Sequence, residues 1–450
     1  MAEQLEADEL LLEPIRKTGR GFWIALALLS SLIAWGAAAY LTQLNVGLGG
    51  TGLHQPVSWG FYVTNFVFFI GISHAGTLIS AILRLSRAEW RRPVTRMAEV
   101  ITCMVLLVGG AQIVVDLGRP DRLLNVIRYG RYQSPLLWDA TSITAYLTAS
   151  TVYLYLPMIP DIAILRDNCT KYNFLYRVLA LGWTGSERQQ RILDRAITIM
   201  MVMVIPIAIS VHTVVSFVFS MTLQPMWHST IFGPYFVVGA IFSGIAALII
   251  AMLIFRRAYH LEAYLKDIHF RYLGQLLLVM SLLWFYFTFA EYLTAYYGGE
   301  PEEMKVFWSK FLGRFRWQFW AMFTCNFVVP ILCLTRLSKN TVQRVLVASI
   351  TIVIGMWLER YIIVVPSLSS PRLPFQEGSY APTWVEWGEL AGSFGLFSVF
   401  YLLFTKFFPV ISIWEMKEGR HEAIEEVMGR VKSYLPDTPP AAAAQAEVSS

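Results

Sequence analysis

The residues of this 450-residue chain most able to do chemistry are acids and histidines inside long apolar runs. A charge in the middle of a lipid bilayer is costly, so an ionisable residue there marks a site for protons, ions or a ligand. Five of these ten residues fall in the first half of the chain. Along the whole sequence they are His74, Glu99, Asp116, Asp139, His212, Glu291, Glu359, Arg360, Glu386 and Glu389.

Two of the acids stand at the ends of consecutive apolar runs. Asp116 begins the sequence DLGRP and Asp139 ends the sequence SPLLWD, so both carboxylates are expected at matching depth, at one edge of the membrane. With Arg119 and Trp138 beside them, they could accept the protons of a membrane-soluble hydroquinone and position its ring. The alternative is structural, with Asp139 capping a helix and Arg119 pairing with a carboxylate.

The two histidines raise the question of a b-type haem. At a helix rise of about 1.5 Å per residue, His74 and His212 differ in depth by an amount on the order of 10 Å. Two axial ligands of one haem share a level, so we expect no haem between them. His74 is interpreted as a proton relay or a hydrogen-bonded packing residue, with Glu99 and Glu291 as further proton-transfer candidates. His212 lies nearer the acidic edge and is a candidate quinone contact.

The remaining residues have simpler interpretations. Glu359 and Arg360 can compensate each other's charge or form ion pairs with other helices. Glu386 and Glu389, near the outer surface, can be solvated. No CxxC pair, GxxxxGK[ST] or HExxH occurs, so the sequence predicts no metal site and no phosphate-binding loop. The cysteines are predicted to be small packing residues, and they are Cys103, Cys169, Cys325 and Cys333.

The composition of the chain indicates that these residues lie in a protein embedded in a lipid bilayer. The chain is 56% hydrophobic and 15% charged, with a mean hydropathy of +0.52, which excludes disordered and disulfide-framework classes. The net charge of +5 is small, and Lys and Arg come in short bursts between apolar runs, which excludes a nucleic-acid binder. Ten continuously apolar runs predict an all-α integral membrane protein with ten transmembrane helices. They are Phe22–Leu44, Trp59–Leu83, Val94–Leu117, Leu136–Met158, Ala196–Phe219, Ile231–Phe255, Tyr272–Tyr297, Trp317–Leu334, Val345–Val365 and Thr383–Phe408.

The distribution of basic residues predicts the orientation. When loops are assigned alternately to two sides, 26 of the 36 Lys and Arg lie on the side that holds both termini, and 9 lie on the other. Both termini are therefore predicted to be cytoplasmic. The first run also fits a cleavable secretory signal, but it continues past its Ala37–Ala39 site to Leu44, so we expect a retained span.

The predicted membrane domain covers residues 22–408, between a cytoplasmic N-terminal segment, 1–21, and a cytoplasmic tail, 409–450, that is disordered from about 436. Within this domain, Gly60, Gly71 and Arg84 recur as Gly233, Gly244 and Arg257 at a constant offset. This repeat suggests two four-helix bundles, residues 59–219 and 231–365, with the first and last helices peripheral. The alternative is that small residues at helical spacing are common packing devices.

Several motifs follow one another in a specific order. The first half contains Trp59-Gly60, Asn65-Phe66, GISHAGT from Gly71, DLGRP, SPLLWD and Pro160-Asp161. The second half contains WHSTIFGPYFVVGAIFSG from Trp227, FAEYLTAYYGG around Glu291 and Trp387-Gly388-Glu389. As a set they resemble the NrfD-type, or polysulphide-reductase-like, integral membrane subunits. The likeness covers nearly the whole chain and is closest to the ten-helix quinol-binding subunit of alternative complex III.

The resemblance implies a haem-free subunit of a bacterial inner-membrane complex that binds menaquinol near the external surface, with Asp139 and Asp116 at the quinol site and Asn65 among the quinone contacts. It also implies an external iron–sulfur subunit, a multihaem cytochrome c subunit and further membrane subunits, including a paralogue of this chain. Relatives of this kind have His at the position of Asp116 and Asp at the position of Val218.

These observations predict a membrane subunit of a quinol oxidoreductase complex that has no redox centre of its own, neither haem nor iron–sulfur cluster. Its electrons must leave through another subunit. Two alternatives come from other classes. His74, Glu99 and the Glu359–Arg360 pair within the membrane would suit a proton translocator. A passive anchor for external redox partners would bind no quinone at all.

Overall fold

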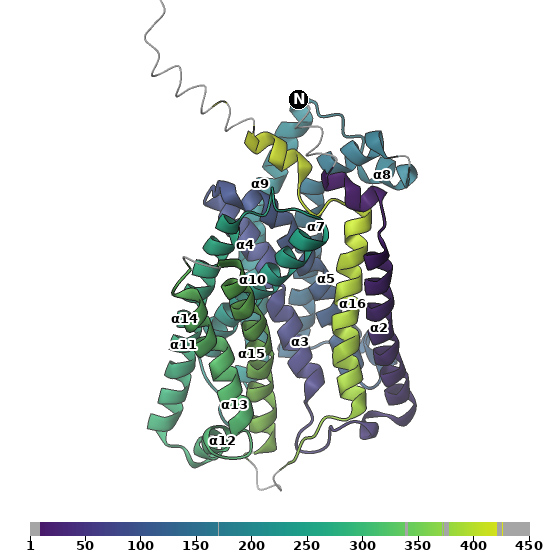
Figure 1. Ribbon diagram of the computed structural model, residues 1–450. Helices are drawn as coiled ribbons and strands as arrows, with labels where there is room; N and C mark the ends of the chain where they lie inside the picture. The colour runs from purple at the N-terminus through teal and green to yellow at the C-terminus, as the bar shows by residue number, and fades with distance from the viewer. Residues whose placement is uncertain are drawn as a thin grey trace, which may run out of the picture.

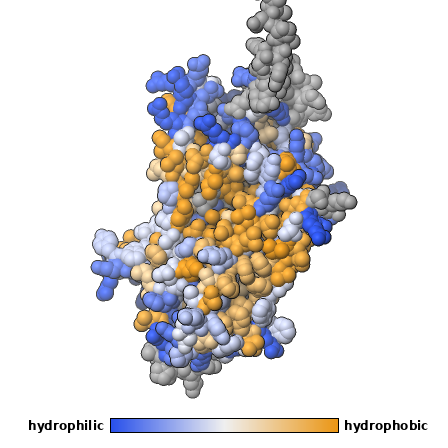
Figure 2. Space-filling view, turned by 90° about the vertical axis from the view of Figure 1, so that its left-hand side faces the viewer, coloured by the Kyte–Doolittle hydropathy of each residue, from blue (hydrophilic) through white to orange (hydrophobic). Residues whose placement is uncertain are grey.

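The structure, a computed structural model, describes residues 10–420 apart from 170, 338–340, 371 and 373–377, together with residue 425. Long apolar helices form a bundle whose surface shows a hydrophobic band between two more hydrophilic ends (Figure 2). Within the described residues, nine helices are long and apolar enough to cross a membrane. The prediction of an all-α integral membrane protein is confirmed. The tail expected to be disordered from about residue 436 lies outside the described residues.

A short helix over residues 10–16 precedes the helices of Figure 1, where all but α6 carry a label. These are α2 (Arg20–Val46), α3 (Phe61–Ile72), α4 (His74–Leu85), α5 (Arg92–Asp116), α6 (Asn125–Arg128), α7 (Pro135–Asn168), α8 (Asn173–Leu179), α9 (Glu187–Ser220), α10 (Phe232–Ala258), α11 (Asp267–Gly298), α12 (Pro301–Phe311), α13 (Arg316–Phe323), α14 (Val329–Leu334), α15 (Thr341–Ser369) and α16 (Trp384–Phe407). A π-helical turn, Thr324–Val328, joins α13 to α14.

The second predicted span, Trp59–Leu83, is not one continuous helix. It forms α3 and α4, which are separated at Ser73. Both pack along α5 and α10, so together they follow the length of these two long helices. The Ser73 carbonyl at the break accepts hydrogen bonds from Thr102 Oγ1 at 2.6 Å and from the Tyr146 hydroxyl at 3.1 Å. These side chains compensate for the interrupted helical bonding.

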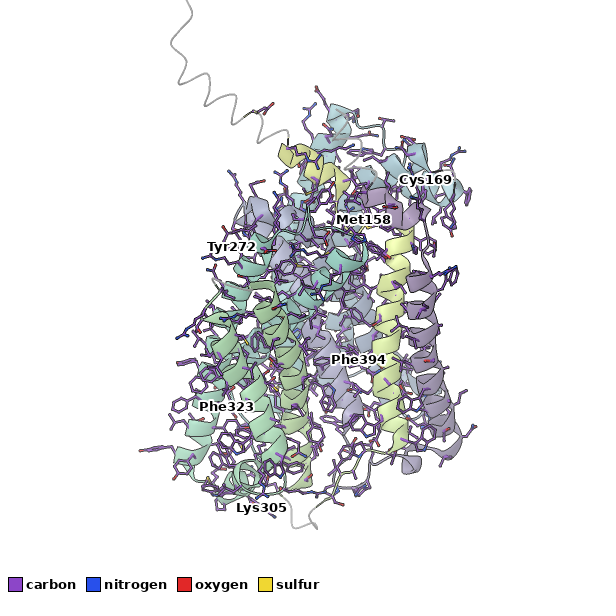
Figure 3. The ribbon with its side chains drawn as sticks, in the orientation of Figure 1. Met158, Cys169, Tyr272, Lys305, Phe323 and Phe394 are labelled. Atoms are coloured by element: carbon purple, nitrogen blue, oxygen red, sulfur yellow. The ribbon has the colours of Figure 1, made fainter. Side chains whose placement is uncertain are left out.

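Both described termini lie at the upper end of the bundle in Figure 1. The helices from α3 to α9 pack mainly on one another, as do those from α10 to α15, and α10 also packs on α3, α4 and α9. The first and last long helices, α2 and α16, form a pair, and α16 contacts α3 and α5. On α16, Phe394 lies in the lower half of the bundle (Figure 3), with its ring 5.2 Å from that of Phe69. The division into two duplicated units stays a prediction.

The α2–α16 pair is held together by glycines. A Cβ added at Gly36 of α2 would lie 2.8 Å from the Gly392 Cα of α16 and 3.0 Å from the Gly388 carbonyl oxygen. Backbones this close leave no room for a side chain, which is how small residues drive helix association in lipid. The contact brings the outer pair of helices against the rest of the bundle.

At the upper end, a buried acid holds the segment that follows α16. The Asp161 carboxylate of α7 pairs with the Arg96 guanidinium of α5. It also accepts hydrogen bonds from the backbone N–H groups of Ile413 and Trp414, at 3.1 and 2.9 Å. It therefore caps, from another helix, the first turn of the helix over residues 413–420.

A second acid, Glu415, completes this attachment. Its carboxylate lies 2.6 Å from Arg84 Nη2 and 3.0 Å from Arg91 Nη1, and it is buried. Burial acts to raise the pKa of Glu415, but the charges of Arg84, Arg91 and Arg96 outweigh it and hold that pKa below its ordinary value. Asp161 and Glu415 thus attach the segment after α16 to α4, α5 and α7 through buried ion pairs and hydrogen bonds.

Candidate functional site

A cavity of about 410 Å³ opens at the lower end of the bundle, between α3, α5, α6, α7 and α9. This volume lies in the usual range for sites that bind small organic ligands. Most of its lining is apolar: Val63, Phe66, Ile113, Leu117, Leu123, Leu124, Val126, Ile127, Leu136, Ala140, Val215, Val218 and Phe219. The cavity suits a hydrophobic ring system.

Asp116 and Asp139 both line this cavity. Asp116 is the last residue of α5 and is half-buried, and Gly118, with φ +63°, turns the chain away just after it. Asp139 is buried, at 6% exposure, and its Oδ1 has no hydrogen-bond partner among the described residues. An unpaired carboxylate oxygen in an apolar wall is costly, so it marks a place where a donor belongs.

The structural alternative for these two acids does not hold. Ser134 is the N-cap of α7 and Asp139 lies five residues further on, so Asp139 caps no helix. Arg119 is exposed and pairs with Asp121, at 3.1 Å, rather than with Asp116 or Asp139. Arg119 thus points out of the site because its nearest acid is two residues along the same turn. The pairing holds the pKa of Asp121 below its ordinary value.

Trp138 also lies outside the cavity lining. Its indole N–H donates to the Tyr132 carbonyl oxygen, which ties the start of α7 to the preceding loop. On a helix, neighbouring residues are about 100° apart, so Trp138 and Asp139 face different sides. The Trp138 side chain therefore does not line this cavity, where we expected it to contact a quinone ring.

Two polar wall residues were not among the sequence candidates. Gln112 of α5 and Tyr62 of α3 are buried and line the cavity. Gln112 Nε2 donates to Ser393 Oγ at 2.6 Å, and the Tyr62 hydroxyl donates to Gln43 Oε1 at 2.6 Å. Gln112 Oε1 has no partner among the described residues. The only sequence signal for them is that a polar residue interrupts an apolar span.

The interpretation of Glu386 and Glu389 as solvated is wrong. Glu386 is fully buried, and its carboxylate accepts hydrogen bonds from the Gly52 and Thr383 backbone N–H groups and from the Tyr380 hydroxyl. Glu389 is also buried, and its Oε1 has no partner among the described residues. The reason is that the loop after α2 covers the lower end of α16, where open water was expected.

The predicted difference in depth between His74 and His212 is also wrong. Their ring centroids are 3.6 Å apart. Side chains lean toward the N-terminus of their own helix. Because α4 and α9 run in opposite directions, His74 leans toward the lower end and His212 toward the upper end, so the rings meet. His74 Nε2 lies 2.7 Å from the Ala208 carbonyl oxygen, whereas neither ring nitrogen of His212 has a partner among the described residues.

The other quinone and proton-transfer candidates lie outside the cavity lining. Asn65 accepts a hydrogen bond from the Trp357 indole at 2.9 Å, between α3 and α15. Glu99 accepts a bond of 2.6 Å from Ser80 Oγ, which also lies 3.2 Å from the Tyr153 hydroxyl. Glu291 accepts a bond of 2.7 Å from Ser229 Oγ. The structure thus separates these residues from Asp116 and Asp139.

Glu359 and Arg360 are buried and pair with each other, with Arg360 Nη1 3.2 Å from Glu359 Oε2. The Trp284 indole donates to the other carboxylate oxygen of Glu359, and Arg360 lies over the Phe236 ring. Their charges are compensated, as one of the two sequence interpretations expected. No group of three or more His, Cys, Asp and Glu among the described residues could hold a metal ion.

Fold and site together define a multi-pass membrane protein whose helices enclose a cavity lined with carboxylates. The chain belongs to the NrfD family, because the family model described as polysulphide reductase, NrfD, matches residues 49–371. The predicted family is confirmed. The likeness to the subunit of alternative complex III stays a prediction.

Individual relatives agree with this family. A protein named as a membrane subunit of dimethyl sulfoxide reductase, from Halobacterium salinarum, is 28% identical over 314 residues, which are 69% of this chain and 65% of that protein. A selenate reductase subunit of Mesobacillus selenatarsenatis is 23% identical over 88% of this chain and 95% of its own length. The Hdr-like menaquinol oxidoreductase integral membrane subunit of Archaeoglobus fulgidus is 23% identical over 90% and 96%.

Proposed function

We propose that this chain is the quinol-binding membrane subunit of an oxidoreductase complex and that it takes part in the oxidation of menaquinol. The observation that carries the proposal is the cavity, where two carboxylates interrupt an apolar wall. One similar protein is named as a menaquinol oxidoreductase subunit, which supports the choice of quinone. The site would face the external side of a bacterial cell membrane, with both termini in the cytoplasm.

In this proposal the apolar lining holds the ring of the quinol, and the two carboxylates act as bases. Oxidation breaks two O–H bonds and releases two protons and two electrons. Asp139, with its unpaired Oδ1, accepts one proton, and Asp116 accepts the other. Gln112 and Tyr62 replace Arg119 and Trp138 as the polar groups that orient the ring.

The electrons go to a metal centre of a partner subunit. For this role we propose an external iron–sulfur subunit next to a multihaem cytochrome c subunit, with further membrane subunits that include a paralogue of this chain. Isolation of the intact complex should therefore yield these redox subunits together with the chain.

The test is Asp139→Asn in the assembled complex, with Asp121→Asn as the control. Asp121 is an exposed carboxylate near the same membrane edge that is already paired with Arg119. A positioned general base contributes roughly 10²–10⁴-fold to rate. We expect quinol oxidation to fall at least about 100-fold in Asp139→Asn, with quinone still bound, and to stay normal in the control. Normal turnover of Asp139→Asn would refute the assignment.

A second candidate function is proton translocation. Glu99 is buried in the upper half of α5 and connects through Ser80 to Tyr153, and His74 contacts His212 nearer the middle of the bundle. Buried ionisable groups along one bundle are typical of proton relays. Glu99→Gln in sealed vesicles separates the two functions, since an unchanged proton-to-electron ratio would leave only the redox role.

A further inference from the structure

Two polar residues of the cavity wall form hydrogen bonds with the outer helices, α2 and α16. Gln112 and Tyr62 line the cavity, but their hydrogen bonds point away from it. Gln112 donates to Ser393 of α16, and Tyr62 donates to Gln43 of α2. The hydrogen-bonded wall therefore extends from the cavity into the interface between these two helices.

Glu389 lies one helical turn from Ser393, inside this interface. The Ser393 hydroxyl donates to the Glu389 backbone oxygen at 2.7 Å. The carboxyl group is buried, at 6% exposure, and its Oε1 lacks a partner among the described residues. Keeping a buried carboxyl group ionised costs free energy when no basic partner is present, so the group readily takes up a proton.

The groups around Glu389 indicate the direction in which a proton could move. On α3, Tyr62 lines the cavity and its hydroxyl reaches Gln43 of α2, and it interacts electrostatically with Asp116 and with Glu386 and Glu389 of α16. On α2, Tyr40 interacts electrostatically with Glu389 and is partly exposed. The titratable groups around Glu389 are therefore Tyr40 of α2, Tyr62 of α3 and, one turn away on its own helix, Glu386, while Asp116 of α5 reaches Glu389 only through Tyr62.

We propose that Glu389 is the relay through which protons released at the cavity leave the protein, along the interface between α2 and α16. The inference rests on the proposed function of the cavity. A proton taken from a quinol hydroxyl by Asp116 passes to the Tyr62 hydroxyl oxygen. The hydroxyl's own proton, which Gln43 Oε1 accepts in the structure, turns to the Glu389 carboxylate, so that Asp116 is again a base. The proton then passes Tyr40 to water at the lower end, while the two electrons leave separately to the metal centre of the partner subunit.

The test compares Glu389→Gln and Glu389→Asp in the intact complex, with Glu302→Gln of the exposed part of α12 as the control. An amide fills the space of the carboxyl group but takes up no proton. We expect Glu389→Gln to lower kcat at least about tenfold, with KM for menaquinol and thermal stability unchanged. Its rate should keep rising with pH where the wild-type rate is level, because solvent must then remove the proton. Glu389→Asp should restore part of the activity.

Three outcomes would overturn the inference. One is wild-type turnover with a wild-type pH profile in Glu389→Gln. Another is loss of activity together with thermal stability, without rescue by Glu389→Asp, because that describes a packing residue. The third is a wild-type complex that neither binds nor oxidises menaquinol, and this result would remove the proposed function as well. Loss of turnover in Asp139→Asn with an unaffected Glu389→Gln would leave the proposed function standing alone.

Discussion

Among the glycines that the structure describes, Gly76 leaves the least room for a side chain, and this predicts the effect of a substitution there. A Cβ added to Gly76 of α4 would lie 1.8 Å from the Ala98 carbonyl oxygen and 2.1 Å from Thr102 Oγ1, both on α5. Real Cβ atoms essentially never come closer than 3.0 Å to a neighbour. Gly76→Ala must therefore push the two helices apart by about 1 Å, because a backbone carbonyl cannot move aside.

The cost follows from two contributions. Overpacking of a well-packed interface costs about 1–3 kcal/mol. Thr102 Oγ1 also donates to the Ser73 carbonyl oxygen at 2.6 Å, and weakening such a hydrogen bond costs about 1 kcal/mol. We expect Gly76→Ala to lose about 2–4 kcal/mol of stability.

Thermal unfolding of the purified chain in detergent measures this effect. Gly110→Ala on α5 is the matched control, because its added Cβ would meet nothing within 4 Å, and Gly71→Ala is an intermediate case with its nearest neighbour at 3.5 Å. Gly76→Ala should unfold several degrees lower than both. Equal unfolding temperatures for Gly76→Ala and Gly110→Ala would refute the packing argument.

Three further predictions concern the upper ionic cluster and the cavity. Asp161→Ala leaves Arg96 buried without its partner and should cost about 3–5 kcal/mol, measured by thermal unfolding; an unchanged midpoint would contradict it. The lowered folded-state pKa of Glu415 stabilises the fold above its unfolded-state pKa and loses this effect as pH falls through the folded value. Glu415→Gln should therefore be less stable than wild type at pH 7, with the difference vanishing on acidification, and a constant difference at every pH would argue against it. Val218→Phe fills part of the cavity and should weaken quinone binding at least about tenfold, whereas Val347→Phe, at a 49% exposed position, should not. Equal quinone affinity of these two variants would show that the cavity does not hold the ring.

The fold was largely predictable because lipid demands long apolar helices, and such helices leave a strong signal in sequence. The break at Ser73 was not predicted, since no proline marks it and the stabilising hydrogen bonds come from Thr102 and Tyr146, far along the chain. The shared position of Asp116 and Asp139 followed from the turn between their helices. Sequence order is enough here, because the two residues lie at facing ends of consecutive membrane helices, which meet at the same edge of the membrane.

The rest of the site depends on contacts that spacing does not encode. The meeting of His74 with His212 depends on the directions in which their side chains lean, which a count of helical rise omits. No motif predicts the roles of Gln112 and Tyr62. Their hydrogen-bond partners, Ser393 and Gln43, lie on α16 and α2, far from them in the sequence. One signal was overlooked: Thr383 followed by Glu386 has the spacing of a capping box, and it predicts a carboxylate bound to backbone N–H groups.

The glycine contact between α2 and α16 has a consequence for biogenesis. An early helix is paired with a much later one, because Gly36 and Gly392 stand 356 positions apart in the chain. At about 5–20 residues per second, ribosomes need roughly 20–70 s to deliver the second member. During that interval the glycine face of α2 lies in lipid without its partner, and the wall of the cavity that α16 supports forms only after α16 has been made.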